Sequence, residues 1–357
     1  MPYSQRNILA AVTLFVVAPL VAEYLLGDFS ITFLWPLLVM MPMYGGGALL
    51  IRELTRRTGR GWPSILLLGC AYAIIEEAFT TQSLFNPHYL GMTLLSHAWI
   101  PSLGISAWWT LFMLNVHPFW SIGVSIALVE GLFPSAAGVS SSVRVASPAA
   151  GLSPSRVPAP WLGKVGLTVA AVFFSIGAFF STTYQLHHDP FRASRAQLLV
   201  SALFVVLFAA AAFLIPPASR SQSTGRRNPG PVPPPWVMGA IAFILGAAVF
   251  FAPAFWDWPA VFLMFGVDLV FLVALGLFSR CEGWTPLHTL SAGAGGALFY
   301  GVHAFMQPPV TPTPKPLVLM SHTTLLVLAA AVIAAGALRT RAARRAALTS
   351  APAEVPS

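Results

Sequence analysis

The chain has 357 residues, of which 57% are hydrophobic and only 8% are charged. A soluble core of ordinary size cannot bury that share of apolar side chains, so the composition predicts an all-α, polytopic integral membrane protein. The formal net charge of +8 does not predict nucleic-acid binding, because the basic residues lie in short segments between apolar stretches.

Stretches of about 20 mostly apolar residues, the length that crosses a bilayer as one helix, occur about ten times along the chain. The first follows Arg6 and lacks a small-residue cleavage site, so we expect it to be retained as a span and not removed as a signal peptide. The expected spans are residues 8–26, 31–50, 62–79, 107–132, 161–183, 196–216, 236–255, 259–279, 287–306 and 317–338.

The basic residues are distributed unequally between the segments that join these spans. If the N-terminus lies in the cytoplasm, all but three of the 19 Lys and Arg residues fall on the cytoplasmic side, the exceptions being Arg192, Arg195 and Lys315. The positive-inside rule therefore predicts an even number of spans and two cytoplasmic termini. We expect a multi-pass protein of the plasma (cytoplasmic) membrane, with the lipid bilayer as its partner and no nucleic acid.

Composition also predicts how the chain is divided. Residues 133–160 are rich in Ser, Pro, Gly and Ala, which is typical of a flexible cytoplasmic linker. This linker would separate an N-terminal four-helix half, residues 1–132, from a C-terminal six-helix half, residues 161–338. We expect residues 339–357 to form a basic, disordered tail.

Two adjacent glutamates, Glu76 and Glu77, lie in the third apolar stretch. A carboxylate in hydrocarbon costs at least a few kcal/mol, so carboxylates there usually pair or face a water-filled cavity. At about 1.5 Å of rise per residue, both glutamates lie at a depth similar to that of His117, Asp268 and His303. We therefore predict that Glu76 or Glu77 meets His117, and that His303 or Asp268 is an additional member of the site.

The local sequence suggests how these groups are presented. Neighbouring residues of a helix point about 100° apart, so we expect one glutamate to be the working base and the other to contact a neighbouring helix. Pro118 follows His117, and its missing N–H should kink the fourth span beside the imidazole. Glu130, near the inner end of that span, is expected to pair with arginines of the linker or to reach the interface.

The Glu76-Glu77 pair and the stretch Phe299-Tyr-Gly-Val-His303 resemble motifs of the CPBP family, the CAAX-prenyl-protease and bacteriocin-processing intramembrane endopeptidases. The arginine of that family's first motif is a threonine in this chain. The resemblance implies an intramembrane protease in which Glu76 or Glu77 activates water. It also implies that His117 or His303 binds a metal or stabilises the oxyanion.

Three functions are open on these residues. An intramembrane hydrolase would use Glu76, Glu77 and His117 to cleave a membrane-embedded peptide or small molecule. Its histidines, His117 and His303, would hold any divalent metal such as zinc. A proton- or cation-coupled transporter would instead use Glu76, His117 and Asp268 as a relay beside the helix break. In a structural or assembly protein the same residues would only join helices.

Overall fold

The computed structural model describes residues 3–135, 157–217, 232–279, 281 and 283–349, and these residues are mostly helical. Each of the ten predicted spans corresponds to one helical segment. Within the described residues, eight of these segments are long and apolar enough to cross a membrane, whereas Pro235–Phe250 is shorter and Pro286–His303 is not among the eight. The predicted class, a multi-pass α-helical membrane protein, is therefore confirmed.

The first four helical segments each combine α-helical turns with a stretch of wider π-helical turns. Their bounds are α1 Tyr3–Pro19 with η1 Leu20–Leu25, α2 Trp35–Met40 with η2 Met41–Gly45 and α3 Gly46–Arg57, α4 Trp62–Ile74 with η3 Ile75–Thr80, and α5 Ala107–Asn115 with η6 Val116–Val124 and α6 Ser125–Leu132. Between η3 and α5 the chain forms short 3₁₀ turns and a two-residue antiparallel pair, β1 Trp99–Ile100 with β2 Ile105–Ser106.

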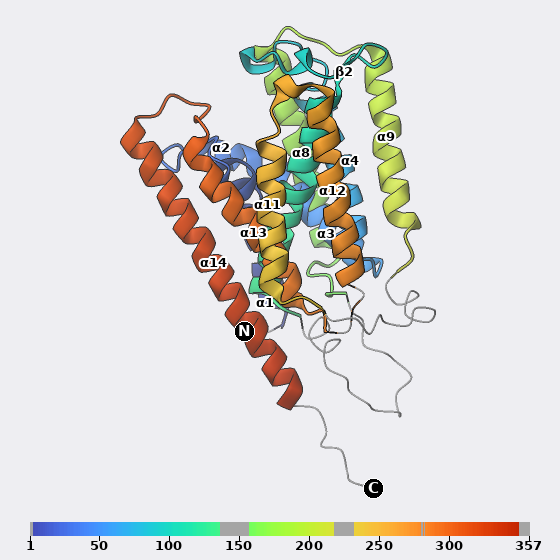
Figure 1. The fold of residues 1–357 in the computed structure, drawn as a ribbon. Helices are drawn as coiled ribbons and strands as arrows, with labels where there is room; N and C mark the ends of the chain where they lie inside the picture. Colours follow the sequence, from blue (N-terminus) through green and yellow to red (C-terminus); the bar gives the residue numbers. More distant parts are fainter. Residues whose placement is uncertain (1–2, 136–156, 218–231, 280, 282, 350–357) are drawn as a thin grey trace.

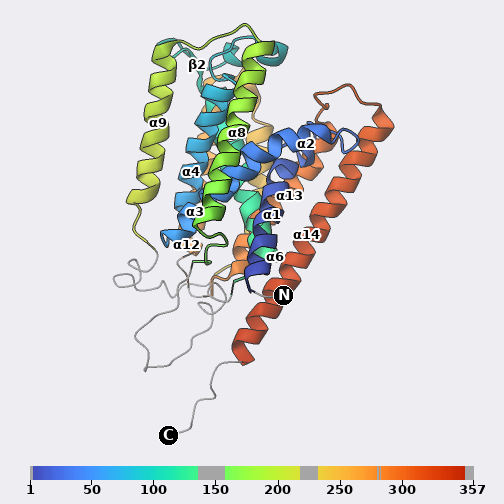
Figure 2. The same ribbon diagram turned by 180° about the vertical axis from the view of Figure 1, so that it is seen from behind.

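The remaining helices are regular and surround the first four. They are α8 Lys164–His188, α9 Arg195–Leu214, α11 Pro235–Phe250, α12 Trp258–Phe278, α13 Pro286–His303 and α14 Lys315–Thr349. Helix α8 packs on η2 and α3, α9 packs on α4, and α13 packs on α6, η6, α11 and α14. Figures 1 and 2 show α9 and α14 on opposite flanks of the bundle. The two predicted halves thus pack against each other and do not stand apart as two bundles.

The structure describes only part of the predicted linker, residues 133–160, and part of the predicted tail, residues 339–357. Of the linker, residues 136–156 lie outside the described residues. Of the predicted disordered tail, residues 339–349 belong to α14, so this part of the prediction is wrong. The segment alternates pairs of Ala with Arg, both strong helix formers, and therefore continues the helix beyond the apolar stretch. Residues 350–357 lie outside the described residues.

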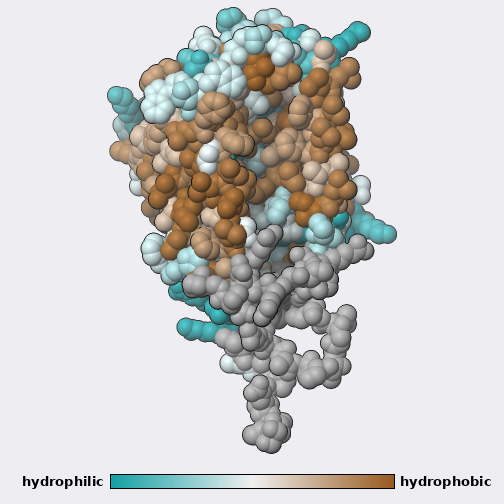
Figure 3. All heavy atoms as spheres, turned by 45° about the vertical axis from the view of Figure 1, so that its right-hand side comes forward, coloured by the Kyte–Doolittle hydropathy of each residue, from teal (hydrophilic) through white to brown (hydrophobic). Residues whose placement is uncertain are grey.

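The bundle has two polar ends separated by an apolar band. Figure 3 shows this band on one face, with hydrophilic residues above it. Residues 81–106, with β2, form one end, here called the loop end (Figure 1). The opposite end, here called the arginine end, carries Arg52, Arg56, Arg57 and Arg60 near the turn between α3 and α4.

The arginine end is held by ion pairs. Arg56 forms two hydrogen bonds with Glu130, of 2.8 and 2.9 Å, and Arg52 reaches the same carboxylate at 3.1 Å. Arg52 also lies over the ring of Trp161, 3.3 Å from its centroid. Glu130 therefore pairs with arginines of α3, which packs on α6, whereas the linker arginines expected as its partners, Arg144 and Arg156, lie outside the described residues.

One close helix contact sets the position of the site. A Cβ atom added at Gly69 of α4 would lie 2.8 Å from the Cα of Pro118 in η6, which is closer than real Cβ contacts allow. Only glycine lets these two backbones approach to this distance. The contact brings the end of α4 and its continuation η3 alongside η6, and with them the predicted site residues.

Candidate functional site

Glu76, Glu77 and His117 converge. The His117 Nε2 atom lies 2.8 Å from Glu77 Oε1, and its Nδ1 atom lies 3.3 Å from Glu76 Oε2. All three side chains are buried, with exposed fractions of 4 to 6%. Among the described residues they are the one group of three or more His, Cys, Asp or Glu side chains whose ligand atoms lie within 4.8 Å of one another.

Both glutamates contact the same imidazole, which corrects the expectation that one of them would turn to a neighbouring helix. The two ring nitrogens of His117 lie on different edges of the ring, so the two carboxylates need not point at one atom. Glu76 approaches one edge and Glu77 the other. Neighbouring helical residues can therefore act on one partner when that partner is an imidazole inserted between their side chains.

The site lies where the helices depart from α-helical geometry. Each of the four π-helical stretches in the described chain carries one part of it: Glu23 in η1, Tyr44 in η2, the two glutamates in η3 and His117 in η6. Wider turns of this kind occur frequently at functional sites. In η2 and η6 a proline removes one backbone donor, and in η3 the amide of Thr81 bonds to the carbonyl of Glu76 at 2.8 Å.

Glu77 is fixed by donors from the loop end. The hydroxyl of Ser83 donates to Glu77 Oε2, and the Thr81 hydroxyl donates to the same atom at 3.1 Å. Ser83 in turn accepts a hydrogen bond of 3.1 Å from the indole N–H of Trp109. With His117 on its other oxygen, Glu77 has partners on both carboxylate oxygens, which restricts its orientation and that of the ring.

Three further residues border the site that the sequence alone did not single out. Tyr44 donates a hydrogen bond of 2.5 Å to Glu23, and its ring stacks on His117 with 6.4 Å between centroids. Tyr72 packs edge-on against the same ring at 5.8 Å. Glu23 lies close enough to interact electrostatically with Glu76 and His117. The available signal for Glu23 was an acidic residue near the end of the first apolar stretch.

Two buried polar atoms at the site, one in Glu76 and one in Tyr72, lack a regular hydrogen bond within the described part of the chain. Neither Glu76 Oε2 nor the hydroxyl of Tyr72 makes a hydrogen bond of regular geometry among the described residues, although the Tyr72 hydroxyl lies close enough to the Glu76 carboxyl group to interact with it. Buried polar atoms are nearly always satisfied, so an unsatisfied pair at one place needs an explanation. The geometry leaves these two atoms available to a bound molecule.

The other predicted members lie elsewhere. The carboxylate of Asp268 accepts a hydrogen bond of 2.9 Å from Asn115, which lies two residues before His117 and so faces another side of the helix. The ring of His303 packs against Phe250, with 4.8 Å between centroids, because α13 turns it toward α11. Neither residue belongs to the Glu76, Glu77 and His117 group, which corrects their predicted inclusion.

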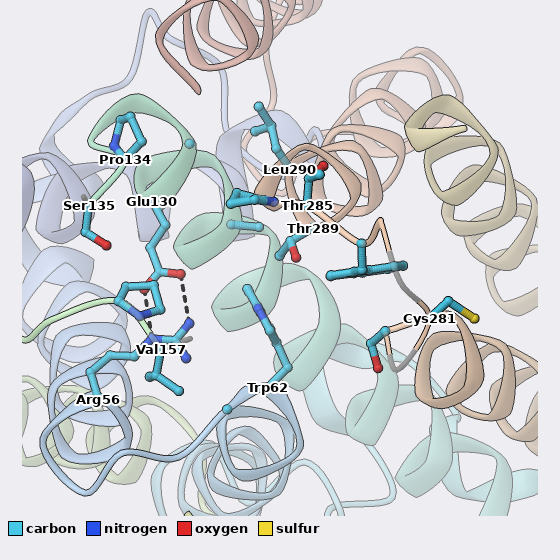
Figure 4. Close-up of a pocket in the computed structure, with 17 residues that line it drawn as sticks. Arg56, Trp62, Glu130, Pro134, Ser135, Val157, Cys281, Thr285, Thr289 and Leu290 are labelled. Atoms are coloured by element: carbon cyan, nitrogen blue, oxygen red, sulfur yellow. Dashed lines mark hydrogen bonds and ion pairs between the residues drawn. The ribbon is translucent and has the colours of Figure 1, made fainter. Parts of the chain in front are cut away.

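A pocket of about 190 Å³ opens at the arginine end, not at this site. Figure 4 shows Arg56 and Glu130 paired on one side of it, with Trp62 and Thr289 also lining it. Trp62 begins the helix that carries Glu76 fourteen residues later, which is about 21 Å along the axis. The pocket is thus separate from the carboxylate and imidazole site.

Comparison with known families supplies an identity but no activity. A family model described as an uncharacterized membrane protein family matches residues 12–223, which is more than half of the chain. The chain belongs to this uncharacterized membrane protein family. The matched region contains Glu23, Tyr44, Glu76, Glu77 and His117. No curated protein and no solved structure matches the chain, so the resemblance to CPBP endopeptidases stays a prediction.

Proposed function

We propose that this protein is an intramembrane hydrolase whose water is activated by Glu76 and His117. The observation that supports this is the free Glu76 Oε2 atom, buried 3.3 Å from a ring nitrogen of His117 while Glu77 holds the other nitrogen. A water molecule bound to both atoms would sit beside a carboxylate in a site of low polarity, where a general base is effective.

The chemistry follows from the arrangement. Glu76 accepts a proton as the oxygen of water attacks the carbonyl carbon of the substrate, and the carbonyl oxygen becomes negatively charged. The hydroxyl of Tyr72, which lies beside the Glu76 carboxyl group, is the donor proposed for that oxygen. The proton on Glu76 then passes to the leaving group as its bond to carbon breaks. Glu77 fixes the orientation of His117 throughout and does not touch the substrate.

The substrate class follows from the location of the site. The site is lined by buried side chains, and Glu76 lies about 21 Å along its helix from Trp62 at the arginine end, which favours entry of the substrate from the bilayer or from the loop end. We propose a membrane-embedded peptide or a small lipid-like molecule with a hydrolysable carbonyl group. We also propose that the arginine end faces the cytoplasm of the plasma (cytoplasmic) membrane, as its Arg residues favour.

The test is hydrolysis by the purified protein in lipid nanodiscs, using a panel of fluorogenic membrane-anchored peptides and acyl esters. We expect turnover by the wild type and a loss of at least about 100-fold in Glu76→Gln and His117→Gln, the scale of general-base catalysis. Asp268→Asn, a buried acid outside the site, is the matched control. Equal rates in all four proteins would refute the hydrolase.

A second function is favoured by one observation: Tyr44 contacts the site and Glu23 at once. Its ring stacks on His117, and its hydroxyl donates a hydrogen bond to Glu23. Carboxyl, hydroxyl and imidazole groups in this order can pass protons within a membrane. This proton relay predicts proton flux into proteoliposomes under an imposed potential, with Glu23→Gln and Tyr44→Phe reducing it. Flux without hydrolysis of any substrate would favour the relay over the hydrolase.

A further inference from the structure

The separation between Glu76 and His117 is not that of an ordinary hydrogen bond. Their atoms Oε2 and Nδ1 lie 3.3 Å apart, yet the Oε2 atom has no hydrogen-bond partner. Two ligands of a tetrahedral ion, each about 2.0 Å from it, stand about 3.3 Å apart. The pair is therefore spaced as two neighbouring ligands of one metal ion would be.

The partner of the second ring nitrogen supports this assignment. His117 Nε2 lies 2.8 Å from Glu77 Oε1, and a carboxylate accepts but does not donate a hydrogen bond. If the ring is neutral, its proton therefore resides on Nε2, and Nδ1 then has a lone pair on the side of Glu76, where the Ser121 hydroxyl also lies 3.5 Å from it. A carboxylate that orients a ligating histidine from the far side of the ring is the common second layer of zinc sites.

The charges around this point also call for a cation. Glu76 and Glu77 lie together around His117, and Glu23 lies close enough to Glu76 to interact with it. Within the described residues, His117 is the one basic side chain in an ion pair with any of these three acids. Buried carboxylates without a counter-charge are costly in a membrane. If Nδ1 binds a divalent ion, the His117 ring is neutral, and the ion itself would balance two of the three acids.

We infer that Glu76 Oε2 and His117 Nδ1 are ligands of a zinc-class divalent ion, with Glu77 as the positioning carboxylate behind the histidine. Mixed nitrogen and carboxylate ligands suit Zn²⁺ better than Ca²⁺ or Mg²⁺, which prefer oxygen ligands. Water and substrate would fill the further coordination positions, so this site would have one protein ligand fewer than the three that are usual in catalytic zinc sites. This inference deepens the proposed hydrolase and rests on it for its catalytic meaning. A bound zinc ion would supply Lewis-acid chemistry by lowering the pKa of its water, and Glu76 would then act as a ligand instead of as the general base.

The test is Zn²⁺ binding by the full-length protein in detergent, after removal of metals with EDTA. Metal content is measured by mass spectrometry and affinity by calorimetric titration. We expect one Zn²⁺ per chain, a loss of affinity of at least 100-fold in Glu76→Gln and in His117→Gln, and a loss of about 10- to 100-fold in Glu77→Gln. The control Asp268→Asn should bind as the wild type does.

Two further measurements keep the outcome interpretable. The variant His187→Ala/His188→Ala removes the exposed histidine pair at the end of α8, the main competing site for Zn²⁺. Absorption of the Co²⁺-loaded wild type reports the coordination geometry directly, so a variant that fails to fold does not decide the result. Intense visible bands, typical of four-coordinate Co²⁺, support the site.

The inference is overturned if the wild type binds no Zn²⁺ with one-to-one stoichiometry, if Glu76→Gln and His117→Gln bind as tightly as the wild type, or if only the His187→Ala/His188→Ala variant loses the ion. Its failure is distinct from failure of the proposed hydrolase. Hydrolysis that continues in EDTA would reject the metal site and keep the hydrolase proposal. Stoichiometric Zn²⁺ binding without hydrolysis would keep the metal site and reject the hydrolase.

Discussion

At the scale of single residues, the site depends on how each polar atom is paired. Glu77 has partners on both oxygens, whereas Glu76 keeps one oxygen uncommitted beside His117. Adjacent carboxylates therefore have different roles because their neighbours differ. Tyr44 connects this pair to Glu23 through its hydroxyl group and through its ring.

Removing the Tyr44 hydroxyl tests this connection. Tyr44→Phe leaves the Glu23 carboxylate without its donor, so we expect the free energy of unfolding to fall by about 1–3 kcal/mol. Thermal unfolding in detergent measures the change. Tyr184→Phe removes a hydroxyl from an exposed ring and is the control. Equal unfolding temperatures for the two variants would show that the hydrogen bond to Glu23 contributes nothing.

At the scale of helices, the site exists because α4 and η6 approach closely. The contact between Gly69 and Pro118 leaves no space for a side chain. Both helical segments continue in π-helical turns next to this contact, and these turns carry Glu76, Glu77 and His117. The close helix contact and the π-helical turns together position the three side chains of the site.

Gly69→Ala tests the helix contact. The added methyl group would meet the backbone of Pro118, which cannot move aside as a side chain can, so we expect destabilisation of about 1–3 kcal/mol and a loss of Zn²⁺ affinity. Gly266→Ala in α12 is the matched control, since its Cβ would meet no heavy atom within 4 Å and alanine favours a helix. If Gly69→Ala behaves like Gly266→Ala, the close approach does not set the site.

At the scale of the whole molecule, the two ends have different tasks. The loop end supplies Ser83 and Thr81 to the site, while the arginine end fastens α3, α6 and the segment before α8 together. Arg52 is fully buried and contacts Glu53, Glu130 and Trp161. The end opposite the site thus fixes the relative positions of the helices that carry it.

Arg52→Ala tests this anchoring role. It removes the partner of buried carboxylates, which typically costs about 3–5 kcal/mol in unfolding free energy. Arg341→Ala, an exposed arginine of α14, should change stability little. Unfolding by heat or by SDS in mixed micelles compares the two. A stable Arg52→Ala protein would show that the arginine end does not determine the packing.

The orientation of the molecule in its membrane is open to a labelling test. In a protein with Cys70 and Cys281 replaced by Ser, we expect Ser102→Cys at the loop end to react with a membrane-impermeant thiol reagent in intact cells. Arg341→Cys on α14 should react only after the cells are opened. The opposite pattern would reverse the orientation predicted from the distribution of arginines.

The sequence by itself determined the class of this protein, the places of its helices and the shared depth of Glu76, Glu77 and His117, from which we predicted that one of the two glutamates meets the imidazole. These features are local: apolar length fixes a span, and residue spacing fixes depth. Only the tertiary structure decided that Glu23 and Tyr44 join the site, that Asp268 and His303 do not, and that Glu130 pairs with arginines of α3. The direction in which a side chain points depends on helix rotation, on π-helical turns and on contacts such as Gly69 with Pro118, which arise between distant segments.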